Sequence, residues 1–285
     1  MIIIKIHGGL GNQMFQYAFG RNLSLLHNTP FMIDSSYLRG ANQSERSLVL
    51  QNFNTILSEA TLEEIHKYCG TFQKILDRLR PESKRRKILE NPDIFDQNIL
   101  KRTDGYFDGY WNDEKYFREN WNTIQKDFTL KNPFGSKALE TAQLIESQPN
   151  AVNLHIRRGD YVSISKIANM YTSLPFSYYE NAMNKILKAY PDAHFFISSD
   201  DISWVKENFP KNYPATFLSS KEIPDYEELI LMSLCKHNII ANSTFSWWGA
   251  YLNQNQNKIV VAPKNWFKDE SKNPNPIILP TWIQM

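Results

Sequence analysis

Residues 151–162 read AVNLHIRRGDYV, and the interpretation of the whole chain starts from this stretch. Its first part, from Ala151 to Leu154, is mostly apolar and typical of a buried strand, and Arg157 and Arg158 follow shortly after it. In open α/β sheets, ligands bind at the carboxyl ends of the strands. Each guanidinium presents a rigid fork of donors that matches phosphate oxygens. The stretch therefore predicts a strand that ends at an anion-binding edge, the alternative being two solvated arginines in a surface turn.

The residues after this stretch alternate between helical and strand-like patterns. We expect helices over residues 176–190, 202–208, 225–235 and 247–253, and strands over residues 193–198, 215–218, 237–241 and 258–262. Strands that alternate with helices in this way predict a parallel sheet.

Two of these strands also end in polar residues. The candidates for ligand binding at these ends are Ser199, Asp200, Asp201, Asn242, Ser243, Thr244 and Ser246. Serine and threonine at a helix start cap it, and the free N–H groups there attract an anion. Carboxylates can accept hydrogen bonds from ribose hydroxyls or from the N–H groups of a base. Together with the arginines, these residues predict a site for a nucleoside diphosphate group. A helix cap is a sufficient role for one of the two aspartates, but not for both.

Transfer of a group from such a donor leaves a nucleoside diphosphate, whose growing negative charge must be stabilised. Some enzymes use a metal ion held by Asp-x-Asp, but no such triplet stands near a strand end of this sequence. Arg157 and Arg158 can supply the positive charge instead. Asp200 and Asp201 as metal ligands are the rival interpretation.

The N-terminal half opens with a strand, a glycine-rich turn and a helix. Residues 1–7 are mostly apolar, residues 8–13 read GGLGNQ, residues 14–26 have apolar side chains near helical spacing, and residues 31–34 form a second predicted strand. In this arrangement the helix N-terminus faces the carboxyl edge of the first strand.

Three interpretations of the glycine-rich turn are open. A dinucleotide-binding turn has glycine where Met14 stands, and the Gly-Lys-Ser/Thr of a P-loop does not follow. A purely structural turn is the second interpretation. The third, which we favour, is that Gly9, Gly11, Asn12 and Gln13 bind a sugar or a phosphate.

The signals between residues 35 and 150 are weaker. Thr61 and Glu64 predict a capping box for a helix over residues 58–68, and a second helix is expected over residues 72–80. The basic extension of that helix through Lys87 is either solvated surface or a contact with an anionic membrane face.

Residues 104–111, DGYFDGYW, are interpreted as an aromatic, turn-rich loop whose rings either stack on sugars or belong to the core. Helices over residues 121–130 and 137–147 follow. We therefore expect two domains, residues 1–148 and residues 149–285.

The composition is that of an ordinary globular protein. The chain has 285 residues, of which 42% are hydrophobic and 13% aromatic. Its formal net charge of +2 gives no argument for nucleic-acid binding. The apolar start MIIIKI is too short for a signal peptide or a membrane span, so we expect a cytoplasmic protein, with a peripheral position at the inner face of the membrane left open. The oligomeric state does not follow from these features.

Four motifs occur in order along the chain: GGLGNQMFQYA at residues 8–18, HIRRGDY at 155–161, FFISSDD at 195–201 and ANSTFSWWGAYL at 241–252. This combination resembles the α-1,2-fucosyltransferases of glycosyltransferase family 11. The resemblance is weakest in the middle of the N-terminal half.

The resemblance implies a GT-B fold, in which two Rossmann-like domains face a cleft. It implies GDP-β-L-fucose as donor substrate, no metal and no further cofactor. L-Fucose would pass with inversion to O2 of a terminal β-galactoside. The N-terminal domain would then be the acceptor side, and the C-terminal domain would bind GDP-fucose.

The resemblance also implies roles for individual residues. Arg157 would hold the β-phosphate and stabilise its departing charge, assisted by Arg158. Ser243 and Thr244 would contact the phosphates. Asn12 would face the pyrophosphate and the fucose.

By the same resemblance, His155 and one of Asp200 and Asp201 would lie near guanine and ribose. Asp160 is the only acid of its motif and our candidate for the base that takes the proton of the acceptor hydroxyl. A salt bridge that orients an arginine is the alternative role for Asp160.

Two other function classes are weighed against this one. A nicotinamide-dependent enzyme would use the glycine-rich turn, but Met14 disfavours it. A non-catalytic carbohydrate-binding protein would use the aromatic residues 104–111, but it would leave Arg157 and Arg158 unexplained.

Overall fold

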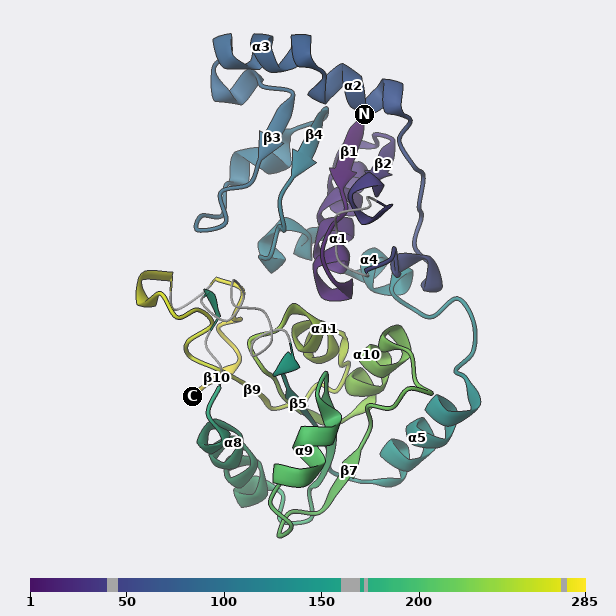
Figure 1. Ribbon diagram of the computed structural model, residues 1–285, viewed down its shortest axis with the longest axis vertical. Helices are drawn as coiled ribbons and strands as arrows, with labels where there is room; N and C mark the ends of the chain where they lie inside the picture. Colours follow the sequence, from purple (N-terminus) through teal and green to yellow (C-terminus); the bar gives the residue numbers. More distant parts are fainter. Residues whose placement is uncertain (40–45, 160–169, 172–173, 273–275) are drawn as a thin grey trace. The chain divides into compact units, whose positions relative to one another are not determined.

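The computed structural model describes residues 1–39, 46–159, 170–171, 174–272 and 276–285. The chain forms two compact units, Met1–Asn132 and Pro133–Met285, and each contains a parallel sheet with helices around it (Figure 1). The predicted α/β class with two Rossmann-like sheets is therefore confirmed. The units divide after Asn132 rather than after residue 148, because helix α5 (Ser136–Ser147) packs its buried face into the core of the C-terminal unit.

The N-terminal unit has a four-stranded parallel sheet. Its strands, in spatial order, are β2 (Phe31–Asp34), β1 (Ile2–Lys5), β4 (Gly105–Asp108) and β3 (Lys87–Leu89). Its helices are α1 (Leu10–His27), α2 (Leu62–Cys69), α3 (Thr71–Leu79) and α4 (Trp121–Asp127). The predicted capping box at the start of α2 is confirmed, since Thr61 and Glu64 exchange both hydrogen bonds.

Helix α1 packs closely on β1 and β2 through Gly20, nearly three turns into the helix. A Cβ atom added at Gly20 would lie 2.4 Å from side-chain atoms of both Ile4 and Phe31. Met14, which stands where a dinucleotide-binding turn has glycine, is fully buried in the core. The close helix–strand contact that such turns achieve at that position is therefore made further along α1.

The segment interpreted as an aromatic loop contains the strand β4, so the loop interpretation was wrong, while the alternative that most of its rings belong to the core is confirmed. β4 pairs with both β1 and β3. Phe107 and Trp111 are fully buried and form part of an aromatic core with Phe19, whose ring stacks 4.2 Å from that of Trp111. Tyr110 alone of the aromatic residues in this segment is exposed.

The C-terminal unit has a six-stranded parallel sheet. Its strands, in spatial order, are β10 (Ile283–Gln284), β9 (Val260–Ala262), β8 (His237–Ile239), β5 (Ala151–Ile156), β6 (His194–Ser199) and β7 (Ala215–Phe217). Its other helices are α8 (Phe176–Ala189), α9 (Ile202–Asn208), α10 (Asp225–Leu234) and α11 (Thr244–Leu252).

The strand order of this sheet reverses at β5. From β5 the chain proceeds outward to β6 and β7, and then returns to β8 on the other side of β5. All six residues of β5 are buried, because neighbouring strands and helices cover both faces. A reversal of this kind leaves a crevice outside the carboxyl ends of β5 and β8, the two strands between which the order reverses. Open α/β sheets bind ligands in such a crevice.

None of the helices in the described part of the chain combines the length and the apolar character needed to cross a membrane.

Candidate functional site

The carboxyl end of β5 carries two arginines that are each paired with an aspartate from the end of β6. Arg157 Nη1 lies 3.0 Å from Asp200 Oδ2, and Arg158 Nε lies 3.3 Å from Asp201 Oδ2. The backbone N–H of Arg158 also donates to Asp200 Oδ1 over 2.8 Å. The four charges lie at the sheet edge that the strand reversal marks, so two of the predicted polar clusters converge there.

Two further features, one at Arg158 and one at Gly159, stabilise this arrangement of charges. The guanidinium of Arg158 lies over the ring of Trp204, 3.7 Å from its centroid, in a cation–π arrangement. A Cβ atom added at Gly159 would lie 2.6 Å from Asp200 Oδ2. Glycine at this position therefore allows the carboxylate to approach the backbone after β5.

Asp201 also begins helix α9. Its side chain accepts a hydrogen bond from the backbone N–H of Trp204, so the predicted cap is confirmed for this aspartate. The Ser199 hydroxyl accepts from the N–H of Asp201, which tightens the same turn. Ser199 is 6% exposed and acts mainly as a structural residue of the strand end.

His155 lies inside the strand, with only 2% of its surface exposed. Its Nδ1 atom is buried without a hydrogen-bond partner. Burial lowers its pKa to about 3, and nearby Arg157 adds to this while Asp200 opposes it. His155 is therefore neutral and packs inside the sheet at the end of β5, and it does not offer a charged group to a ligand.

The carboxyl end of β8 leads into helix α11 through Asn242 and Ser243. Ser243 is the N-cap residue but makes no side-chain capping hydrogen bond, so the predicted cap was wrong. Thr244 is the first helical residue and is partly exposed. The Ser246 hydroxyl is buried and donates to backbone carbonyls of the preceding turn, and the Asn242 amide donates to Trp266 O. Of these residues, Thr244 is the most accessible to an anion, whereas Ser243 is only 8% exposed.

Glu228 also lies near this edge, although it was not selected from the sequence. It lies in the first turns of α10, is 9% exposed, and its side chain hydrogen-bonds to Ser219, just after β7. Burial raises its pKa to about 7, with smaller contributions from the neighbouring charges of Asp225 and Asp200. The signal in the sequence was weak, because α10 begins with three acids, Asp225, Glu227 and Glu228, and Glu227 is buried as well.

The predicted glycine-rich loop of the N-terminal unit is partly helix. Helix α1 begins at Leu10 with Gly9 as N-cap, so Gly11, Asn12 and Gln13 occupy its first turn. Gly8 has a positive φ of 82°, a conformation that favours glycine, and the Asn12 side chain lies against it.

Gln13 is a structural residue, contrary to its predicted binding role. It is fully buried, its Nε2 donates to Gly8 O and Ser47 O, and its Oε1 accepts from Val49 N. Asn12 is partly exposed, and the Arg46 guanidinium lies against Gly9. A sugar or phosphate at this turn would therefore meet Asn12 and Arg46 rather than Gln13.

His7, at the end of β1, is a second residue that the sequence did not single out. Its ring packs against Tyr110 and Tyr37, with centroids 4.6 and 5.7 Å away. Burial lowers its pKa, and Lys5 adds to this. Its Nε2 atom has no hydrogen-bond partner. A neutral imidazole is therefore available at the carboxyl edge of the N-terminal sheet.

Asp160, the candidate base, lies outside the described residues. Within the ranges described, no three His, Cys, Asp or Glu side chains are grouped as metal ligands would be. Metal independence stays a prediction.

The chain belongs to glycosyl transferase family 11, whose sequence profile matches residues 1–285. It is 29% identical to the O-antigen biosynthesis glycosyltransferase WbnK of Escherichia coli, over 98% of this chain and 99% of the relative. It is 31% identical to an alpha-1,2-colitosyltransferase of Escherichia coli, over 96% of this chain and 94% of the relative. It is 24% identical to the mouse galactoside 2-alpha-L-fucosyltransferase Sec1, over 99% of this chain and 73% of the relative.

The fold is also similar to that of a solved fucosyltransferase. A variant of Arabidopsis thaliana FUT1, determined in complex with GDP, matches 95% of this chain and 72% of its own chain with a TM-score of 0.50 and 10% identity. The chain is thus a glycosyltransferase with the fold of the GT-B fucosyltransferases.

Proposed function

We propose that this enzyme transfers L-fucose from GDP-β-L-fucose to O2 of a terminal β-galactoside, with inversion, to form an α-1,2 linkage. The observation that carries the proposal is the Arg157–Arg158 pair, held by two aspartates at the strand reversal of the C-terminal sheet. The family membership and the three relatives support a glycosyl transfer, and two of the relatives have names that specify an α-1,2 or 2-alpha linkage.

The diphosphate of the donor binds to the arginines. A guanidinium has more N–H donors than one carboxylate can accept, so Arg157 can hold a phosphate oxygen while Asp200 keeps it oriented. Arg158, fixed over Trp204, supplies the second positive charge. The N-terminus of α11, with Ser243 and Thr244, adds backbone donors to the same edge.

Glu228 is our candidate for recognition of the base. Guanine presents a ring N–H and an exocyclic amine side by side, and one carboxylate can accept from both. Burial raises the pKa of Glu228 because its ionised form has little contact with water. The N–H groups of a bound guanine would take the place of that water and stabilise the ionised carboxylate.

The reaction is a single displacement. The acceptor hydroxyl oxygen bonds to the anomeric carbon on the face opposite GDP. The bond between that carbon and the β-phosphate oxygen breaks, and its electron pair stays on the phosphate. The hydroxyl proton passes to Asp160 or to a phosphate oxygen. Arg157 stabilises the leaving charge, which is the contribution that accelerates the step most.

A colitosyl donor is the second candidate. The observation that favours it is the 31% identity with the alpha-1,2-colitosyltransferase over nearly the whole of both chains. Both candidates use the same edge of the C-terminal sheet, and they differ only in the sugar that is transferred.

The test is incubation of the full chain with GDP-fucose or GDP-colitose and a panel of galactosides, in the presence of EDTA. We expect transfer of one of the two sugars, with an α-1,2 linkage to galactose in the NMR spectrum of the product. A β linkage, attachment at another hydroxyl, or activity that EDTA abolishes would each overturn the corresponding part of the proposal. The cytoplasmic location expected from the sequence is part of the same proposal.

A further inference from the structure

Helix α3 presents its apolar side chains to solvent. Phe72, Ile75 and Leu79 are 74%, 52% and 81% exposed, and Leu62 at the start of the neighbouring α2 is 73% exposed. In α3 these residues are spaced three and four apart, so they share one face of the helix. A helix of a globular domain normally buries this face, because exposure of large apolar side chains to water costs free energy.

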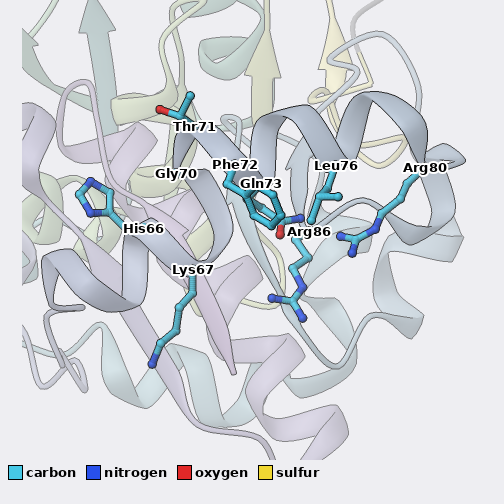
Figure 2. Close-up of a pocket in the computed structure, with 9 residues that line it drawn as sticks. All are labelled: His66, Lys67, Gly70, Thr71, Phe72, Gln73, Leu76, Arg80 and Arg86. Atoms are coloured by element: carbon cyan, nitrogen blue, oxygen red, sulfur yellow. The ribbon is translucent and has the colours of Figure 1, made fainter.

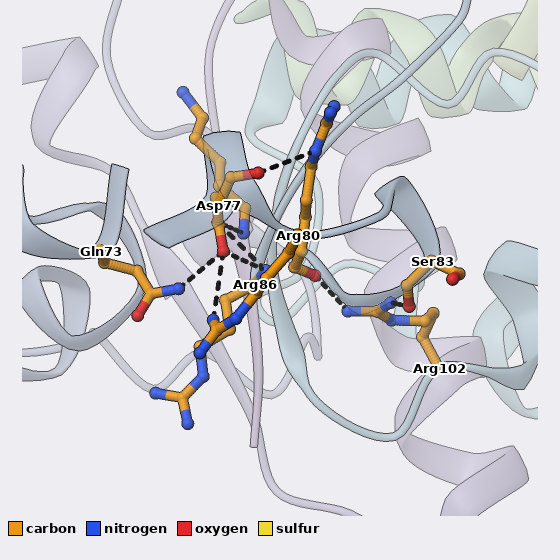
Figure 3. A network of polar contacts seen from close by, with 8 residues as sticks. Gln73, Asp77, Arg80, Ser83, Arg86 and Arg102 are labelled. Atoms are coloured by element: carbon orange, nitrogen blue, oxygen red, sulfur yellow. Dashed lines mark hydrogen bonds and ion pairs between the residues drawn. The ribbon is translucent and has the colours of Figure 1, made fainter. Parts of the chain in front are cut away.

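The polar face of the same helix is turned towards the protein. Gln73 and Asp77 are buried, at 7% and 8% exposed. The Asp77 carboxylate accepts hydrogen bonds from Gln73 Nε2, from Arg80 Nη1 and from the backbone N–H groups of Arg86 and Lys87, over 2.7 to 3.3 Å (Figure 3). This network holds the polar face of α3 against the protein, so the opposite, apolar face is directed to solvent.

The sequence around the apolar face is rich in basic residues, of which Lys67 pairs with Glu63 and Lys87 with Asp108. Between Lys67 and Lys87 the sequence has eight lysines and arginines but only two acids, Asp77 and Glu82, and Asp77 is already neutralised by its hydrogen bonds and Arg80. The basic residues of this segment are Lys67, Lys74, Arg78, Arg80, Lys84, Arg85, Arg86 and Lys87. The segment therefore combines exposed apolar side chains with strong local positive charge in a chain that is nearly neutral overall.

An open hollow of about 640 Å³ lies beside the apolar face, at the junction of α2 and α3 (Figure 2). The cationic side chains of Lys67, Arg80 and Arg86 line it, together with the Thr71 hydroxyl and the apolar Phe72 and Leu76. Positive charge, a hydroxyl and apolar atoms in one hollow match the phosphate and the first acyl carbons of a phospholipid.

We propose that α2, α3 and the basic segment through Lys87 dock on the surface of an anionic phospholipid bilayer. Phe72, Ile75 and Leu79 enter the boundary between headgroups and acyl chains, and the surrounding lysines and arginines bind lipid phosphates. A second copy of this chain is a poorer occupant, because two copies of the same basic segment would repel each other. The proposal does not depend on which sugar the enzyme transfers.

The test is flotation of the full chain with vesicles of phosphatidylcholine, alone or mixed with phosphatidylglycerol. We expect binding to the mixed vesicles that salt reverses, and little binding to phosphatidylcholine alone. The double variant Phe72→Ser/Leu79→Ser should bind at least about tenfold more weakly, because both side chains leave the lipid boundary. The variant Lys84→Gln/Arg85→Gln should lose affinity for the mixed vesicles to a similar extent.

The matched control is Leu139→Ser/Leu144→Ser, which removes two exposed leucines from α5 at 48% and 42% exposure. It should bind vesicles as the unchanged protein does. All variants should retain turnover of a water-soluble acceptor, which shows that they fold. Equal vesicle binding by all variants, or none by the unchanged protein, would overturn the proposal. Concentration-dependent dimerisation that only Phe72→Ser/Leu79→Ser abolishes would assign the surface to a second copy instead.

Discussion

Arg157 Nη1 lies 3.0 Å from Asp200 Oδ2, and this ion pair links the carboxyl ends of the two neighbouring strands β5 and β6. The aspartate also accepts the backbone N–H of Arg158, so one carboxylate orders both the side chain of one arginine and the main chain of the next. The arginines are therefore fixed before a donor arrives. Groups held in place in this way stabilise charge without rearranging during the reaction.

Replacement of Arg157 by alanine should abolish transfer while the fold persists. Loss of a fixed donor to a developing negative charge typically lowers kcat by about 10²–10³. The measurement is release of GDP from GDP-fucose in the presence of acceptor, with circular dichroism to confirm folding. The control is Arg118→Ala, which removes a 62% exposed arginine paired with Glu114 in the N-terminal unit and should leave turnover unchanged. Retained activity in Arg157→Ala would disprove the phosphate role.

Asp160→Asn separates the two roles considered for this residue. If Asp160 takes the proton, the substitution should lower kcat by roughly 10²–10⁴ with little change in GDP affinity. If it only orients an arginine, GDP binding should weaken instead. Calorimetric titration with GDP and steady-state turnover measure the two quantities. Near-normal turnover would exclude the base assignment.

Glu228 should make donor binding depend on pH near neutrality. Its pKa is raised from 4.5 to about 7 by burial, so in the folded protein it is protonated below about pH 7 and ionised above. Only the ionised form can accept both guanine N–H groups. GDP affinity should therefore rise between about pH 6 and about pH 8, and Glu228→Gln should remove this rise. A pH profile of GDP binding that is the same in both proteins would contradict the assignment.

The same shift has a consequence for stability. A raised carboxyl pKa means that the folded state binds a proton more tightly than the unfolded chain does. The stabilising contribution of the protonated Glu228 is present below about pH 4.5 and is lost as pH rises through about 7. The advantage of Glu228→Gln over the unchanged protein in free energy of unfolding should therefore grow over this range, as measured by urea denaturation.

Gly20→Ala should destabilise the N-terminal unit, although alanine is the better helix former. The gain in helix propensity is about 1 kcal/mol, whereas a methyl group forced into a packed core costs about 1–3 kcal/mol. The added Cβ would lie 2.4 Å from side-chain atoms of both Ile4 and Phe31, so the second effect should prevail, by up to about 2 kcal/mol. The double variant Gly20→Ala/Phe31→Leu should recover part of the loss. A higher urea midpoint for Gly20→Ala would show that this contact is not tight.

The C-terminal sheet was predicted well from the sequence because the apolar residues of its strands and helices recur at clear spacings. The expected helix over residues 202–208 and the strand end before Arg157 agree with the structure, and the strand expected over residues 193–198 is β6, shifted by one residue. Convergence of these ends at one edge then follows from parallel topology alone. The pairing of Arg157 with Asp200 and of Arg158 with Asp201 did not follow, since side-chain partners across strands depend on register.

The N-terminal unit was harder to predict, and β4 shows why. Gly105 begins it, Asp108 ends it and Gly109 follows it, and such residues are typical of turns. Its burial between β1 and β3 overrides that local preference. Glu228 was missed because three acids, Asp225, Glu227 and Glu228, begin α10, and the helical period alone does not tell which of them lies near the site.

The paired charges of Arg157, Arg158, Asp200 and Asp201 also affect how the empty enzyme meets other anions. Two isolated arginines would attract any anion within a screening length of about 8 Å at physiological salt. With two carboxylates beside them, these four groups have no net charge, so chloride and free phosphate gain little by approaching. A donor diphosphate that contacts both guanidiniums at once still gains their directed hydrogen bonds. Donor binding should accordingly be selective at short range and only weakly sensitive to ionic strength.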